Sequence, residues 1–274
     1  LIRPAMAHGQ HTSIQSEQLT FTLELVVDNL ESPWGMEFLP NGDLLFSERS
    51  GKLYRFNPKT KAKIAIAGVP DVFTQGQGGL LDLKLHPQYA ETGWIYFSYA
   101  VPAPEGGGNT ALMRAKLQDD TLVSQQLLFK AQPDTQSGVH FGSRIEFDNQ
   151  GLLFFSVGDR GEWDNAQRLT NHSGKIHRLT DDGKIPPDNP FVNMVGAMPS
   201  IWSYGHRNPQ GLVLQPKTGT LWEHEHGPKG GDEVNIIQKG KNYGWPSITY
   251  GINYNGATIS KLTAQAGMEQ PVIY

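Results

Sequence analysis

Apolar and polar residues alternate along this chain in a phrase that occurs four times. Each copy has an apolar strand, a turn rich in Pro, Asp, Asn and Gly, and a second apolar strand. The copies occupy residues 34–48, 79–99, 142–159 and 209–225. In the first copy, Met36 and Phe38 lie two positions apart, and the pattern resumes after the turn at Leu44 and Phe46. This period of two is typical of half-buried strands, so we predict four strand pairs.

A less regular strand follows each pair. These segments are residues 52–56, 111–117, 175–180 and 233–237. Basic or polar residues alternate with apolar ones there, which is expected of an outer strand that faces water. No segment outside the copies shows a sustained helical period.

The repeats begin roughly 45 to 70 residues apart, which suits propeller blades of about 40–50 residues with loop insertions. A β-sandwich is the alternative, but it does not require the same strand–turn–strand phrase four times. We therefore predict an all-β propeller over residues 21–274, preceded by a polar segment at residues 1–20.

Composition narrows the possible functions. The net charge is −4 and no basic run occurs, so nucleic acid is not an expected partner. The absence of cysteine excludes disulfides, iron–sulfur clusters and thiolate zinc sites. No stretch approaches the ~18 apolar residues of a membrane helix. The polar start at Leu1 contains no apolar signal core, so either a signal peptide has been removed or the sequence simply begins there.

Polar residues that flank the inner strands are the candidates for chemistry, because propeller ligands bind at the loops near the central channel. The candidates are Gln77, His140, Asp159, Arg160, the segment 206–208 and the segment 224–233. These loops lie far apart in the sequence. A propeller would bring them to one face.

Two pairs of these residues suggest a reactive site. His140 could act as a general base, and Asp159, at the end of the paired strand, could orient its ring. Arg207 offers a planar fork for carboxylate or quinone oxygens, and Asn208 is held extended by the following proline. An ordinary loop histidine, a turn aspartate and a surface arginine are the alternatives.

The run of residues 224–233, HEHGPKGGDE, is the densest in polar groups. His224 and His226 fall on one face of a strand, which could indicate zinc or copper, but no third ligand is obvious. Asp232, Glu233 and loop carbonyls suit calcium better.

Several long strings resemble one family. GQGGLLDLKLHP, HFGSRIEF, SVGDRG, IWSYGHRNPQGLV and EHGPKGGDEVNIIQKGKNYGWP are similar to the soluble aldose sugar dehydrogenases that use pyrroloquinoline quinone, relatives of soluble quinoprotein glucose dehydrogenase. The resemblance covers roughly residues 21–274. It implies a six-bladed β-propeller of four-stranded antiparallel blades and the oxidation of the anomeric carbon of aldose sugars to the lactone.

The resemblance also assigns roles by position. His140 would take the proton from the anomeric hydroxyl while hydride passes to C5 of the quinone, with Asp159 supporting His140 and Arg207 bonding the quinone oxygen. The implied cofactor contacts are Gln77, His140, Gln167, Arg207, Asn208, His226, Gly227 and Pro228. Gln167, or else Asn165, aligns only loosely with the family's glutamine.

Calcium is the second implied cofactor. The carbonyls of Gly227 and Pro228 would hold one ion against the quinone, where its charge makes C5 a better hydride acceptor. A second, structural calcium would use Glu233 and the carbonyl of Tyr243.

The chain departs from the family in two respects. Val139 replaces an Asp before the histidine and His226 replaces a Gln, which points to the broad-specificity aldose branch. The family also needs about one more blade after Tyr274, with Lys and Arg residues that clamp the cofactor. We therefore expect a propeller that is incomplete at its C-terminus and a weaker hold on the quinone.

Two other functions stay open from the residues alone: a calcium-dependent propeller hydrolase such as a lactonase, and a propeller that binds a sugar or protein without catalysis. The resemblance implies an aldose substrate, an external electron acceptor, a monomer or homodimer, and a periplasmic or secreted location.

Overall fold

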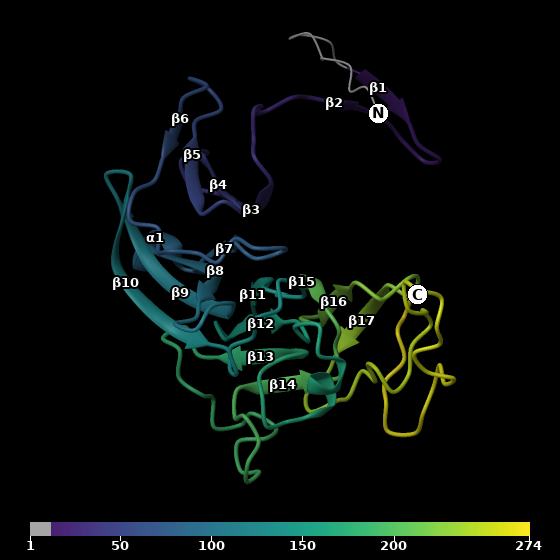
Figure 1. Ribbon diagram of the computed structural model, residues 1–274. Coiled ribbons are helices and arrows are strands. Elements are labelled where there is room, and N and C mark those ends of the chain that lie inside the picture. The colour runs from purple at the N-terminus through teal and green to yellow at the C-terminus, as the bar shows by residue number, and fades with distance from the viewer. Residues whose placement is uncertain (1–11) are drawn as a thin grey trace.

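The computed structural model describes residues 12–274, and its strands form four blade-like sheets and one separate hairpin. Figure 1 shows the four sheets following one another along an arc, with the hairpin of β1 (Thr12–Gln15) and β2 (Thr20–Leu23) set apart from them. This hairpin crosses the boundary we placed after residue 20, while residues 1–11 of the polar segment lie outside the described residues. The prediction of an all-β propeller is confirmed.

Each blade is an antiparallel meander in which strands pair with their neighbours in the sequence. The first blade contains β3 (Pro33–Phe38), β4 (Leu44–Glu48), β5 (Lys52–Phe56) and β6 (Lys63–Ala65). The second contains β7 (Leu80–Leu85), β8 (Trp94–Pro102), β9 (Gly108–Gln118) and β10 (Thr121–Lys130). The third contains β11 (Ile145–Phe147), β12 (Leu153–Val157), β13 (Lys175–Leu179) and β14 (Ile201–Tyr204). The fourth contains β15 (Pro209–Leu214), β16 (Leu221–Glu225) and β17 (Glu233–Ile237).

The expectation of six blades is wrong: the structure has four blades among residues 12–274. The count of six came from the resemblance, whereas the strand–turn–strand phrase itself occurs four times. After β17 the described chain runs through loops with isolated bridges, such as Val234 to Ile273, and forms no further named strand. Four blades therefore use all the strand-forming sequence between β3 and the last described residue.

The four predicted strand pairs are present, but the third strands are more buried than expected. The predicted segments 52–56 and 233–237 coincide with β5 and β17. All five residues of β13 are buried, which contradicts the prediction of a water-facing outer strand. β14 pairs with its outer edge and covers it, so β13 is an interior strand.

The core consists of layers between neighbouring blades. Leu45 of the first blade packs with Leu80 of the second, and Tyr96 of the second packs with Ile145 of the third. Ile176 joins the third blade to the fourth in the same way. These layers remove the apolar faces of adjacent sheets from water and so hold the blades in order.

Three buried serines at the same place in successive blades add polar links between the blades. Ser47, Ser98 and Ser156 each follow a phenylalanine in the second strand and are fully buried. Their hydroxyls donate, respectively, to the carbonyls of Leu81 at 2.5 Å, Ser143 at 2.7 Å and Pro209 at 3.0 Å. Each acceptor lies in or just before the first strand of the next blade.

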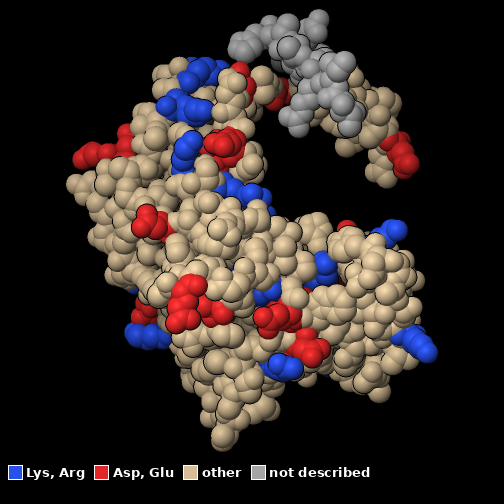
Figure 2. Space-filling model, in the orientation of Figure 1, with Lys and Arg blue, Asp and Glu red and all other residues tan. Residues whose placement is uncertain are grey.

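Helix is scarce in the described chain. It is limited to the four-residue α1 (Tyr89–Thr92) and the 3-10 helix η1 (Trp163–Gln167). No helix within residues 12–274 is long and apolar enough to cross a membrane. Figure 2 shows basic and acidic residues interspersed over the face in view, without a large patch of one sign.

Candidate active site

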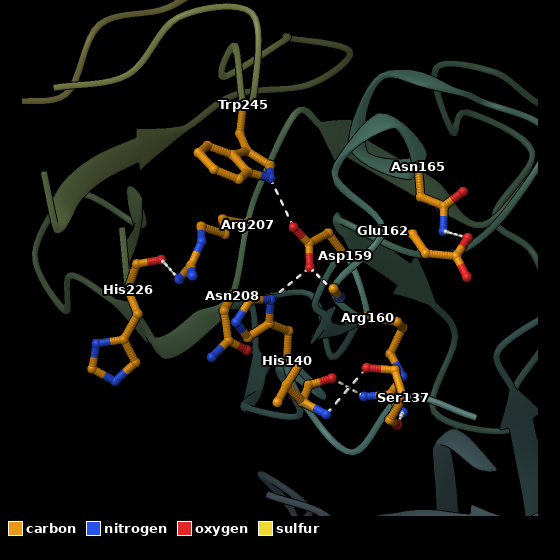
Figure 3. A network of polar contacts seen from close by, with 12 residues as sticks. Ser137, His140, Asp159, Arg160, Glu162, Asn165, Arg207, Asn208, His226 and Trp245 are labelled. Atoms are coloured by element: carbon orange, nitrogen blue, oxygen red, sulfur yellow. Dashed lines mark hydrogen bonds and ion pairs between the residues drawn. The ribbon is translucent and has the colours of Figure 1, made fainter. Parts of the chain in front are cut away.

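His140 and Asp159 form the centre of a buried polar network at the end of the third blade (Figure 3). His140 precedes β11 and Asp159 follows β12, so the pairing of these two strands brings both residues to the same edge. Nδ1 of His140 lies 2.6 Å from Oδ1 of Asp159. The predicted contact between the two side chains is therefore present. Asp159 is fully buried, whereas His140 keeps 9% of its surface exposed.

The carboxylate of Asp159 has two further donors. The backbone N–H of Gly161 donates to Oδ1 at 2.7 Å, and the indole Nε1 of Trp245 donates to Oδ2 at 2.8 Å. Sequence reasoning missed Trp245. A signal was present, because a buried tryptophan N–H needs an acceptor, but nothing in the sequence said which acceptor.

The backbone at His140 is held in an uncommon conformation, with φ of +55°. Its N–H donates to Oε1 of Gln77 at 2.7 Å, so the structure brings Gln77 to the histidine as the sequence suggested. Arg160, fully buried, supports the preceding segment by donating to the carbonyls of Ser137, at 2.5 Å, and Val139. Burial lowers the pKa of Arg160 to about 10, and the Asp159 charge opposes this shift.

Arg207 and Asn208 are placed by a carboxylate from the fourth blade. Oε2 of Glu225 accepts the backbone N–H of Arg207 at 2.5 Å and that of Asn208 at 3.0 Å. Oδ1 of Asn208 in turn accepts the backbone N–H of Gly142 at 3.1 Å, two residues after His140. The Arg207–Asn208 segment and the His140 segment are thus parts of one network.

The guanidinium of Arg207 faces the loop after β16. Its Nη1 donates to the carbonyls of His226 at 3.0 Å and Gly227 at 2.5 Å, as Figure 3 shows for His226. Nε of Arg207 is buried and has no hydrogen-bond partner among the described residues. An unpaired donor on a buried cation is a natural partner for an oxygen of a bound ligand. The ring of His226 is mostly exposed beside it, with 60% of the side chain accessible.

Gln167 is engaged within the protein. Its Nε2 donates to Oδ1 of Asn242 at 3.0 Å and to the carbonyl of Trp245 at 2.7 Å, and its Oε1 accepts from Asn242. Asn165 contacts Glu162 at 3.3 Å. Both side chains therefore stabilise the loop around η1 in this structure.

A second cluster of buried polar groups lies on the sheet of β16 and β17. Glu225 pairs opposite Glu233, and Glu223 pairs opposite Asn235, so all four side chains share one face. Nδ2 of Asn235 donates to both Glu223 and Glu233 at 3.2 Å. Sequence reasoning gave a role to Glu233 but none to Glu225, which lies in the candidate segment 224–233, and it missed Glu223. The alternation of Glu223 and Glu225 along β16 was the available signal.

These carboxylates lack cationic side chains around them. Within residues 12–274, no Lys or Arg forms an ion pair with Glu223 or Glu233, and Oε1 of Glu223 has no hydrogen-bond partner. Burial raises the pKa of Glu233 to about 8 and that of Glu223 well above its ordinary value, and the charge of Glu225 adds to both shifts. Oxygen ligands that repel one another in a buried place suit a divalent cation.

Other potential ligands surround the same cluster. Ligand atoms of His206, Glu223 and Glu225 lie within 4.8 Å of one another. The ring of buried Tyr243 stacks on His206 with centroids 4.7 Å apart, so Tyr243 lies beside the cluster. Neither His224 nor His226 belongs to a group of three metal-ligating side chains in the described part of the chain, so nothing there supports the zinc or copper alternative.

Comparison with known proteins gives consistent matches. The model of the family described as Glucose / Sorbosone dehydrogenase matches residues 30–274. The chain is 44% identical over 260 residues to aldose sugar dehydrogenase YliI of Escherichia coli, covering 93% of this chain and 70% of that protein. It is 30% identical over 269 residues to quinoprotein glucose dehydrogenase B of Acinetobacter calcoaceticus, covering 88% of this chain and 55% of that protein.

Solved structures agree with these matches. The apo crystal structure of the soluble aldose sugar dehydrogenase from Escherichia coli has a TM-score of 0.89 at 44% identity, covering 92% of this chain and 74% of that one. The aldose sugar dehydrogenase of Streptomyces coelicolor in its PQQ-bound form has a TM-score of 0.77 at 32% identity, covering 91% of this chain and 70% of that one.

Proposed function

Because the chain belongs to the glucose/sorbosone dehydrogenase family, we propose that it is an aldose sugar dehydrogenase that uses pyrroloquinoline quinone and forms the lactone from the anomeric carbon. The observation that carries this proposal is the buried His140–Asp159 pair, linked through Asn208 to Arg207. It combines a base with a cation whose Nε is free, which is what the removal of a proton and a hydride from one carbinol requires.

His140 is the proposed base. A carboxylate only accepts hydrogen bonds, so the ring proton sits on Nδ1 against Asp159. Nε2 then carries the lone pair, and no described residue forms a hydrogen bond with it. With part of the ring exposed, Nε2 is the atom that would receive the proton of the anomeric hydroxyl.

Arg207, Asn208 and Gln77 are the proposed groups on the cofactor side. When bound, the quinone supplies an electrophilic carbonyl that accepts the hydride. The Arg207 guanidinium would bond the carbonyl oxygen and stabilise the negative charge that develops there. Glu225 fixes the backbone of both Arg207 and Asn208, so the cation is oriented before any ligand arrives. Gln77 binds the backbone of His140 and would line the same space.

Calcium is proposed at two places. Glu223 and Glu225 are buried and Glu233 is half-buried. These carboxylates fit a structural ion held by Glu233 and the Tyr243 carbonyl, because no Lys or Arg in residues 12–274 forms an ion pair with Glu223 or Glu233. The second ion would use the carbonyls of Gly227 and Pro228. The Gly227 oxygen already accepts from Arg207, and its second lone pair is available to a cation.

Reconstitution tests the proposed function. Protein loaded with calcium and pyrroloquinoline quinone is expected to reduce a redox dye with aldoses, and His140→Ala is expected to lower kcat by about 10²–10⁴-fold while the protein stays folded. His224→Ala, at an exposed position on β16, is the matched control and retains activity. Lactone hydrolysis without quinone would support a hydrolase instead. If the protein showed neither activity, a propeller that binds a sugar or protein without catalysis would be the remaining function. A periplasmic location, an external electron acceptor and the oligomeric state stay predictions.

A further inference from the structure

We propose that Trp245 is a positioning residue that holds Asp159, and through it His140, in the arrangement needed for proton removal. This inference rests on the proposed function of His140. In Figure 3 the indole lies on one side of Asp159 and the imidazole on the other. The Trp245 Nε1 and His140 Nδ1 atoms contact different oxygens of the same carboxylate.

The hydrogen bonds of Asp159 show how much depends on the indole. Oδ1 receives two donors, Nδ1 of His140 at 2.6 Å and the N–H of Gly161 at 2.7 Å. In the described part of the chain, the partner of Oδ2 is Trp245 at 2.8 Å, and no Lys or Arg forms an ion pair with the carboxylate. A fully buried anion that forms no ion pair with Lys or Arg depends on such donors.

The indole N–H of Trp245 helps to determine the direction in which the hydrogen bonds of this network run. An indole N–H can donate but cannot accept. Asp159 must therefore accept at Oδ2, and it accepts the N–H of Gly161 at Oδ1. With both oxygens acting as acceptors, the proton between Asp159 and His140 lies on Nδ1. A serine, asparagine or water in place of Trp245 could reverse its hydrogen bond, whereas tryptophan cannot. The lone pair of His140 is thereby kept on Nε2.

Trp245 is itself firmly held. Only 5% of its surface is exposed. Its backbone N–H donates to the carbonyl of Gly205 at 2.9 Å, and its backbone carbonyl accepts from Gln167 at 2.7 Å. Trp163 packs against the indole edge-to-face, with centroids 5.6 Å apart. The N–H is therefore delivered to Asp159 by a side chain with little freedom to move.

The indole face also lies next to the proposed cofactor cation. The guanidinium carbon of Arg207 is 5.4 Å from the centroid of the Trp245 ring, within the range of a cation–π contact. One side chain, from a segment 86 residues after Asp159, thus contacts both the support of the base and the group that would stabilise charge on the quinone.

A double-mutant cycle tests the role. Trp245→Phe keeps a ring against Arg207 and Trp163 but removes the N–H. We expect kcat for aldose oxidation to fall about 10- to 100-fold with KM nearly unchanged, because a hydrogen bond to a charged group is lost. In an Asp159→Ala background the same substitution should have no further effect on cofactor reduction in a single turnover. Trp202→Phe, which alters a ring packed on Phe154 and Arg178, is the control and should keep full activity.

A spectroscopic readout needs no cofactor. The chain has six tryptophans, and Trp245→Phe identifies the indole N–H signal of Trp245 in a nitrogen–proton correlation spectrum. We expect this signal to lie downfield and to move upfield in Asp159→Ala. A signal that is unmoved by Asp159→Ala, or an equal loss of rate from Trp245→Phe in both backgrounds, would overturn the role. An inactive wild type whose signal does move would instead overturn the proposed function.

Discussion

Gly158 runs so close to His140 that a β-carbon on Gly158 would overlap the carbonyl oxygen of His140. The same β-carbon would lie 3.0 Å from Oδ1 of Asn208. We therefore expect Gly158→Ala to push His140 and Asn208 out of place, with kcat reduced by tenfold or more and stability reduced by about 1–3 kcal/mol. Dye reduction and urea unfolding measure the two effects.

Gly151 supplies the control for that substitution. It lies in the turn before β12 with φ of +79°, and no atom would contact an added β-carbon within 4 Å. Gly151→Ala should therefore cost only backbone strain, about 1 kcal/mol, and leave kcat intact. Full activity in Gly158→Ala would show that the close approach does not position His140.

The hydroxyl of Ser98 is expected to matter for stability rather than for catalysis. Ser98→Ala leaves the carbonyl of Ser143 without its donor in a fully buried place. The free energy of unfolding should fall by about 1–3 kcal/mol, measured by urea denaturation. Ser13→Ala, at an exposed position of β1, should stay near the wild-type value. Equal values for the two variants would refute the link.

Buried neutral histidines should make the fold sensitive to acid. Burial lowers the pKa of His172 to about 4, and nearby Lys175 lowers it further. An unfolded histidine binds a proton below about pH 6.5, so between pH 6.5 and 4 the unfolded chain binds more protons than the folded one. The free energy of unfolding should therefore fall as the pH is lowered through this range, by up to about 1.4 kcal/mol per pH unit for each such ring.

Substitution assigns that slope to its source. His172→Gln keeps an acceptor for the N–H of Gln132, which His172 Nδ1 receives at 2.9 Å, but has no ring to protonate. Urea unfolding between pH 4 and 6.5 should show a shallower slope for this variant than for the wild type. A slope that His172→Gln leaves untouched would show that His172 is not its source and would point to the fully buried His177, whose pKa burial also lowers.

Calcium should stabilise the fold through Glu233. A ligand that binds only the folded state adds about 2.7 kcal/mol at one hundred times its dissociation constant. We expect the melting temperature to rise with calcium and to fall when a chelator removes it, and Glu233→Gln should lose most of the rise. Glu91→Gln, at an exposed position of α1, should keep the full calcium-dependent rise in melting temperature. Identical melting curves with calcium and with chelator would exclude the structural site.

The strands were predictable because their signal is local. Alternation alone placed β5 and β17 at their observed bounds. The number of blades was taken from the resemblance, which describes relatives rather than this chain, and it was wrong. The burial of β13 was also missed, because Lys175 is satisfied by the carbonyls of Asn165, Ala166 and Ser173, which no alternation pattern reveals.

Contacts in the site could be predicted where two residues flank strands that are adjacent in the repeat, and could not be predicted elsewhere. His140 and Asp159 flank paired strands, so their meeting followed from the repeat. Trp245 reaches Asp159 from a loop 86 residues later, and Glu223 joins Glu233 only through the register of β16 with β17. Such contacts depend on how loops fold back over the blades, which neither composition nor spacing encodes.

The serine links between blades all point the same way along the chain. Ser47 donates from the first blade to the second, Ser98 from the second to the third, and Ser156 from the third to the fourth. The last link crosses the seam between the blade that carries His140 and the strand that begins after Asn208. The distance between His140, the proposed base, and Arg207, the proposed cofactor cation, therefore depends on how the third blade packs against the fourth. A slide of the third blade against the fourth would change this distance without breaking a strand.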